Sequence, residues 1–362
     1  MTKGAKKKIT LSSVLNNQFF IPILAISLLV IFDLVTNIGF FKITVNTNSL
    51  GNPVLAGNII TVLSKGTELV FLAVGMTLVT AATGGQDISV GATLAISGSV
   101  IFRIILGSAG GGNDVQFGTV LVAFLAAVVV AMIFGAFNGV LVAFFKIQPM
   151  VATLILYTAG RSIAQWINNN ANMKINDPKF NYIGSNIPGV AIPTPIIITV
   201  VFLVIVALVL KFTTLGLNIQ TVGINEGASR LNGLNPTLVK FATFVILGFC
   251  AAVAGLVYVS RTGSLNYTTA GKDIEMDAIL AVALGGNSLA GGKFNVWASV
   301  LGAYAIQLLY TSLNGSKFID SDGIKAYKAV IIILLVVFSS PKVRDKMSGF
   351  FKKNKKVEKE AA

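Results

Sequence analysis

The sequence contains no histidine, a single cysteine and few charged residues, which make up 12% of its 362 positions. Without histidine, and with one thiol, it lacks the side chains from which most zinc sites and nucleophile–base pairs are built. Cys250 lies inside an apolar run and has no second cysteine to pair with, so we interpret it as a small core residue. We therefore predict no metal, no cofactor and no catalytic site.

The Gly-x4-Gly-Lys-Ser/Thr loop that holds nucleotide phosphates is also absent. The acids nearest to forming a pair, Glu275 and Asp277, are two residues apart and would lie on different faces of a helix. Together with Asp273 they form an acidic group near the predicted span at 276–289. Its alternative interpretation is an ordinary solvated helix start, where acidic side chains are favoured. If ATP drives this protein, we expect another subunit to bind it.

Apolar residues, in contrast, are in excess, at 54% of the chain. This is more than a soluble core of this length would hold, so we predict a polytopic membrane protein, an all-α helical bundle forming one transmembrane domain over residues 1–362. Several apolar segments are shorter than the roughly 20 residues of a perpendicular span, so we expect some to be broken or re-entrant, with eight or nine spans as the alternative to ten. The ten predicted spans are residues 19–38, 68–82, 88–106, 119–145, 151–167, 196–210, 241–259, 276–289, 296–313 and 326–338.

The net charge of +14 would suit a nucleic-acid-binding protein, but the basic residues gather at the two ends of the chain rather than on one face. Four lysines precede the first apolar run, and residues 342–362 form a basic tail. This distribution follows the positive-inside rule, which predicts that both termini are cytoplasmic. We expect membrane lipid, and no nucleic acid, around this protein.

Residues 213–238 form a long polar stretch between two apolar segments. Asn225 can cap a short helix, Glu226 lies in the first turn, where the helix dipole favours an anion, and Arg230 follows at i+4. Gly233 suits the left-handed residue that ends such a helix. A short polar helix cannot bury a core of its own, so we interpret the stretch as a cytoplasmic docking loop, with an ordinary solvated loop as the alternative.

Two glycine-rich breaks, residues 84–91 and 285–292, interrupt the apolar runs with the same Gly-Gly-x5-Gly spacing. Paired breaks indicate a transport path, because unwound backbone at membrane depth persists only where it lines a cavity or is buried in protein. Close helix packing is the alternative, but Asp87 favours a path, since a carboxylate is costly in the bilayer interior. The predicted path residues are Gly84, Gly85, Gln86, Asp87, Gly91, Gly285, Gly286 and Asn287.

A series of short motifs, in this order and spacing, resembles the membrane permease subunits of bacterial ABC importers for simple sugars, the ribose, xylose and galactofuranose group. The resemblance covers nearly the whole chain. The motifs are Ala73-Val-Gly-Met-Thr-Leu78 with residues 84–91, Ile192-Pro-Thr-Pro195, Gly223-x-Asn-Glu-x-Ala-x-Arg-Leu-x-Gly233, Ala270-Gly271, Glu275-Met-Asp-Ala-Ile279, residues 285–292 and Lys328-Ala-Val330.

The resemblance implies that residues 223–233 are a coupling helix that sits in a cleft of a cytoplasmic ATP-binding subunit. This segment differs from the usual pattern at Gly227, where relatives have alanine, and Gln86 stands where many relatives have an apolar residue. The implied coupling residues are Gly223, Asn225, Glu226, Ala228, Arg230, Leu231 and Gly233.

The resemblance further implies alternating access in the bacterial cytoplasmic membrane, with an extracytoplasmic sugar-binding protein and a second permease copy or paralogue as partners. Residues 278–313 are most similar to galactofuranose-type permeases, so we expect a pentose or hexose, with nucleoside import as an alternative. An ion-coupled secondary transporter would need relays of intramembrane acids or histidines, and Asp87 is nearly alone. A membrane-embedded enzyme would need an acid pair or metal motif near an outer loop, and these loops offer little.

Overall fold

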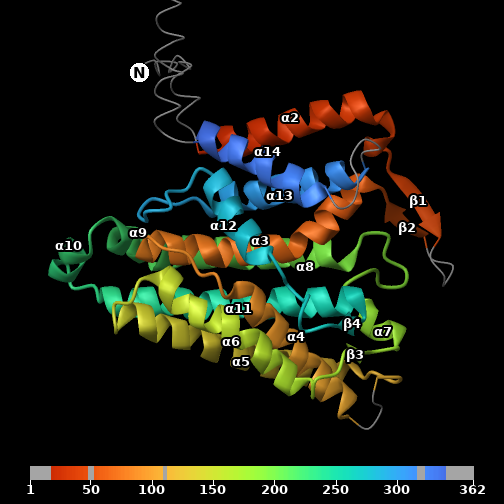
Figure 1. The fold of residues 1–362 in the computed structure, drawn as a ribbon, viewed down its shortest axis with the longest axis horizontal. Coiled ribbons are helices and arrows are strands. Elements are labelled where there is room, and N and C mark those ends of the chain that lie inside the picture. Colours follow the sequence, from red (N-terminus) through yellow and green to blue (C-terminus); the bar gives the residue numbers. More distant parts are fainter. Residues whose placement is uncertain (1–17, 48–52, 109–111, 316–322, 340–362) are drawn as a thin grey trace, which may run out of the picture.

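The structure, a computed structural model, describes residues 18–47, 53–108, 112–315 and 323–339. Figure 1 shows that most of these residues lie in long helices stacked side by side. The lysines before the first helix and the basic tail at 342–362 lie outside the described residues. In chain order the elements are α2 (Phe20–Thr36), η1 (Ile38–Phe41), β1 (Thr44–Thr47), β2 (Pro53–Ala56), α3 (Asn58–Thr83), α4 (Val90–Leu106), α5 (Phe117–Ala143), α6 (Pro149–Ile167), β3 (Met173–Lys174), α7 (Pro178–Asn181), α8 (Thr194–Phe212), α9 (Leu215–Ile224), α10 (Glu226–Leu231), α11 (Pro236–Thr262), β4 (Ser264–Leu265), α12 (Ile274–Leu284), α13 (Val296–Gly315) and α14 (Ile324–Ser339).

The prediction of a polytopic helical membrane protein is confirmed. Within the described residues, α3, α5, α8, α11 and α13 are long and apolar enough to cross a membrane, and α2 and α4 are shorter apolar helices. Each predicted span overlaps one helix of the structure, but the count of ten spans stays a prediction. Two short antiparallel pairs, β1 with β2 and β3 with β4, were not predicted.

α3 begins at Asn58, well before the predicted span at 68–82. The added first turns carry polar residues but no proline to stop the helix, and the one carboxylate of α3, Glu68, lies 2.9 Å from the Arg261 guanidinium of α11. Because that ion pair offsets the cost of burying Glu68, the polar residues continue the helix instead of ending it.

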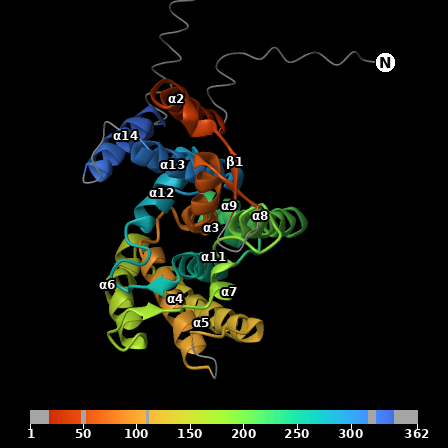
Figure 2. The same cartoon turned by 90° about the vertical axis from the view of Figure 1, so that its right-hand side faces the viewer.

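The centre of the bundle is formed by α3 and α11, the two long helices with the largest buried share. Figure 2 shows α4, α5 and α6 on one side of them and α2, α13 and α14 on the other. At the crossing of α5 and α11, a Cβ added to Gly135 would overlap the Phe244 carbonyl oxygen, and one added to Gly248 would overlap that of Ala131. Small residues therefore set this contact, as expected where lipid supplies no hydrophobic force between helices.

α12 is a half-length helix, which agrees with the expectation that some spans are broken. Its 11 residues rise only about 16 Å, roughly half of the hydrocarbon core, and it ends at Leu284 rather than at 289. A non-helical segment, residues 263–273, leads from the end of α11 to its start. Arg161 of α6 holds this segment, donating to the Ala270 carbonyl oxygen at 2.9 Å.

Candidate functional site

The predicted docking helix is present as α10 and has the predicted cap. The Asn225 carboxamide oxygen accepts a hydrogen bond from the Ala228 N–H at 2.9 Å, and the Arg230 guanidinium donates to the Glu226 carboxylate at 2.8 Å. Gly233 follows the helix with a φ of +79°, in the left-handed region that favours glycine. Leu231 leaves 91% of its surface exposed. The segment therefore ends in a capped turn that presents an apolar side chain outward.

Glu226 has a second partner that the sequence did not reveal. The Lys240 ammonium of α11 lies 2.7 Å from the other Glu226 carboxylate oxygen. The hydrogen bond from Lys240, with the nearby charge of Arg230, holds the pKa of Glu226 below its ordinary value. Glu226 is therefore ionised at neutral pH, and its stabilising contribution is lost only as pH falls through that lowered pKa. The Lys240 bond therefore ties the start of α10 to the beginning of α11, while the Arg230 bond lies within α10.

Residues 215–224, expected only as loop, form the separate helix α9, whose end packs directly against the bundle. A Cβ added to Gly223 would overlap the carbonyl oxygen of Ala81, at the end of α3. The same carbonyl oxygen accepts a hydrogen bond from the Gly292 N–H at 2.9 Å. Gly223 thus connects the docking loop with α3 and with the second glycine break.

The structure brings the two glycine breaks into contact with each other. Gly84 ends α3 with a φ of +66°, and a Cβ added there would lie 2.7 Å from the Ala290 carbonyl oxygen. The Gln86 carboxamide donates to the Leu289 carbonyl oxygen at 3.2 Å. Within the second break, Asn287 donates to the Ser299 hydroxyl of α13 at 2.7 Å. Segments some 200 residues apart in sequence therefore form one hydrogen-bonded layer.

Asp87 is buried and hydrogen-bonded at the start of α4. One carboxylate oxygen accepts from the backbone N–H and the hydroxyl of Ser89, each at 2.7 Å, and the other accepts from the Asn138 carboxamide of α5 at 3.2 Å. Sequence reasoning missed Asn138, although an asparagine inside an apolar span is a detectable signal. Gly91 lies nearby in the first turn of α4, against Gly271 of the segment before α12.

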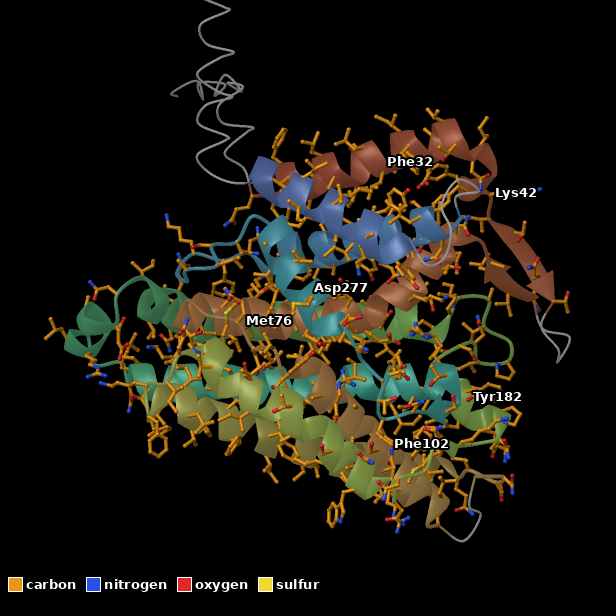
Figure 3. All side chains as sticks on the ribbon, in the orientation of Figure 1. Phe32, Lys42, Met76, Phe102, Tyr182 and Asp277 are labelled. Atoms are coloured by element: carbon orange, nitrogen blue, oxygen red, sulfur yellow. The ribbon has the colours of Figure 1, made fainter. Side chains whose placement is uncertain are left out.

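A cavity of about 940 Å³ lies between α3, α11, α12, α13 and α14. Its wall carries two ion pairs, Glu68 with Arg261 at 2.9 Å and Asp277 with Lys328 at 2.6 Å. In Figure 3 Asp277 lies near the middle of the bundle, farther from α10 than Met76, whose sulfur accepts the backbone N–H of Asp87. None of the predicted path residues lines this cavity, so their role as a substrate path stays a prediction.

Two acids in the cavity wall, Glu68 and Asp277, each form an ion pair with a cation from another helix. Among the described residues there is no group of three or more histidines, cysteines, aspartates or glutamates placed to hold a metal ion. Asp277 and Glu275 point to different partners, as their spacing predicts: Asp277 binds Lys328, and Glu275 packs against Gly91.

Comparison with known proteins places this helical architecture in a family. The family model described as branched-chain amino acid transport system / permease component matches residues 58–340. The chain is 36% identical to the galactofuranose transporter permease protein of Escherichia coli over 83% of its own length and 85% of that protein's. It is 34% identical to the fructose import permease protein of Bifidobacterium longum, over 89% and 88%.

The chain belongs to this permease family. A ribose import permease protein of Escherichia coli is likewise 35% identical over 79% of this chain and 86% of its own. No solved structure matches the chain. The resemblance to ABC importer permeases is confirmed, and family membership supports a multi-pass permease of the bacterial inner membrane that is not itself an enzyme.

The contact of Gly223 with Ala81 predicts that this glycine tolerates no side chain. In Gly223→Ala the new methyl group would also lie 2.8 Å from the Gly292 nitrogen, so we expect overpacking to destabilise the permease by about 1–3 kcal/mol. The matched control is Gly227→Ala, whose methyl group would lie 3.4 Å from the Asn225 side chain and would favour the helix by about 1 kcal/mol. Thermal unfolding of the detergent-solubilised permease checks both, and equal unfolding temperatures for the two variants would contradict the contact.

Proposed function

We propose that this permease imports a simple sugar, a pentose or hexose, by alternating access driven by a separate ATPase subunit. The observation that carries the proposal is the set of relatives at 34–36% identity over most of the chain, whose names specify galactofuranose, fructose and ribose. Galactofuranose is the favoured candidate, because residues 278–313 resemble that group. Import of nucleosides by the same mechanism is the alternative.

Its partners are a cytoplasmic ATP-binding subunit, an extracytoplasmic sugar-binding protein and a second permease copy or paralogue. The capped helix α10, with Leu231 exposed and Glu226 held by Arg230 and Lys240, is the proposed contact with the ATP-binding subunit. An ion-coupled secondary transporter would need no such partner, so co-purification of an ATPase with the permease separates the two classes.

The proposed topology has ten spans with both termini, and the tail at 342–362, in the cytoplasm. The basic residues at the two ends of the chain support it. A reporter that is active only after export, fused after Val357, is expected to be inactive, while a cytoplasmic reporter at the same point is expected to be active. Export activity there would contradict the even number of spans.

The α10 contact predicts a transport defect without a folding defect when its charges are reversed. The exposed Glu226–Arg230 pair stabilises the helix by only about 0.3–0.5 kcal/mol, and the partly exposed Glu226–Lys240 pair, which the reversal also breaks, by about 0–1 kcal/mol. Both losses together are too small to unfold the bundle. In the double variant Glu226→Lys, Arg230→Glu, we expect sugar uptake and co-purification of the ATPase to fall at least several-fold while the amount of inserted permease is unchanged. Normal uptake together with normal co-purification would rule out this contact.

We also propose that the two glycine breaks form the cytoplasmic end of the sugar path. The contact between Gly84 and Ala290, the proximity of Gly223, and the packing of Gly91 on Gly271 at the cavity wall support a continuous route. The competing explanation is that the breaks serve only close packing. Asp87 favours it, since both of its carboxylate oxygens already accept hydrogen bonds from Ser89 or Asn138 and need no substrate partner.

Two variants distinguish a role in the sugar path from a role in helix packing. Gly85→Val adds bulk to the break, where even an added Cβ would lie 2.5 Å from the Pro149 ring, and Asp87→Asn replaces one acceptor with a donor. We expect both variants to lower uptake per inserted molecule. Gly118→Ala, with no atom within 4 Å of the added Cβ, is the control. Normal uptake per molecule in Asp87→Asn, combined with a lower amount of inserted protein in Gly85→Val, would leave the break as a packing element.

A further inference from the structure

We propose that the cavity between α3, α11, α12, α13 and α14 is an outward-facing binding site for the neutral, hydroxylated substrate, occupied before the substrate reaches the glycine breaks. The substrate class rests on the proposed function. The location and chemistry of the site rest on the cavity itself, whose lining includes none of the residues that the sequence pointed to.

The cavity lies toward the end of the bundle opposite to α10. Its lining includes Lys65 near the start of α3 and Arg261 near the end of α11. α11 follows α10 directly, and its 27 residues rise about 40 Å from Pro236, so Arg261 is separated from the docking helix by most of a membrane thickness. Figure 1 shows the same arrangement, with α9 and α10 at one end and the β1–β2 pair at the other. The cavity is therefore on the side that receives substrate from outside.

Four of its seven charged lining residues form two ion pairs with one another, and the other three are Lys65, Lys272 and Asp273. The Lys328 ammonium contacts both oxygens of Asp277, at 2.6 and 2.7 Å, and Arg261 holds Glu68 at 2.9 Å. An ionic ligand would have to compete with these partly buried pairs, and breaking such a pair is costly because it leaves a charge without compensation. A neutral ligand can instead hydrogen-bond to their remaining lone pairs and N–H groups while the pairs stay intact. The part of the wall formed by these two pairs thus favours a neutral polar ligand over an amino acid zwitterion.

The other lining groups suit a sugar. Gln307 of α13 presents a carboxamide, which can donate to one hydroxyl and accept from the next. Its nitrogen donates to the Thr311 hydroxyl at 3.4 Å, a long bond that a ligand hydroxyl can replace. Tyr258 and Tyr310 supply aromatic surface for the apolar C–H face of a sugar ring. A volume of about 940 Å³ lies within the range of small-molecule sites, in which a few polar groups fix the orientation of the ligand.

A labelling experiment on the full importer tests whether the cavity opens outward and is occupied. The natural Cys250 is only 1% exposed, so the unaltered chain provides a low background. Gln307→Cys is treated from outside, in intact cells, with a membrane-impermeant maleimide, and Leu309→Cys, at a buried position of the same helix, is the control. We expect Gln307→Cys to react about tenfold faster than the control, and we expect slower labelling with whichever of D-ribose, D-fructose or D-galactose the importer takes up.

Uptake kinetics provide the second measurement. Gln307→Leu removes the carboxamide at similar volume, and we expect the KM for the imported sugar to rise about tenfold with unchanged amounts of inserted permease, as for the loss of one or two hydrogen bonds. Asn314→Leu, which removes an exposed carboxamide of the same helix outside the cavity lining, is the matched control and should keep its KM.

Each result decides a different question. Equal labelling of Gln307→Cys and Leu309→Cys would show that the cavity does not open outward and would overturn the site. Fast labelling without protection, together with an unchanged KM in Gln307→Leu, would show that the imported sugar does not bind there, while the proposed function would stand on the measured uptake. An unaltered importer that takes up none of the three sugars, but takes up a nucleoside or leucine, would refute the proposed function and the assigned ligand class together.

Discussion

The structure depends on one constraint: in a bilayer, each backbone N–H and C=O group must find its partner inside the protein. Helices meet this requirement by themselves, but the two glycine breaks do not. Their polar groups are satisfied by one another and by the ends of neighbouring helices, as when the Ala81 carbonyl oxygen accepts the Gly292 N–H and Gln86 donates to Leu289. Each break therefore supplies hydrogen-bond partners to the other and to the ends of nearby helices.

The same contact layer shows how α10, the six-residue helix that we propose as the docking contact, is connected to the bundle. Gly223 packs on the end of α3 and beside the second break, while Lys240 ties Glu226 to α11. α10 is therefore joined directly to α11, and through the adjoining α9 to the end of α3 and to the second break. A displacement of α10 by a partner would be transmitted to this layer without passing through a flexible linker, as alternating access requires.

At the end of the bundle away from α10, buried carboxylates are stabilised by ion pairs. Glu68 and Asp277 are placed among apolar helices, where an isolated carboxylate would be costly, and each is held by a cation from another helix. These pairs connect α3 with α11 and α12 with α14, so they position the cavity walls and also make the cavity polar. Arg161 adds to this by holding the non-helical segment that precedes α12. The half-length α12 thus lies between the polar cavity and the glycine layer.

Local chemistry determined much of this protein from sequence alone: the apolar segments, the Asn225 cap, the Glu226–Arg230 pair and the left-handed Gly233 all depend on residues within one or two helical turns. The tertiary structure alone decided which distant groups meet. The partnership of Glu226 with Lys240, the contact between the two breaks and the ion pairs of the cavity join segments whose separation in sequence carries no signal of contact. Periodicity reports which residues a helix buries, but only packing decides what they are buried against.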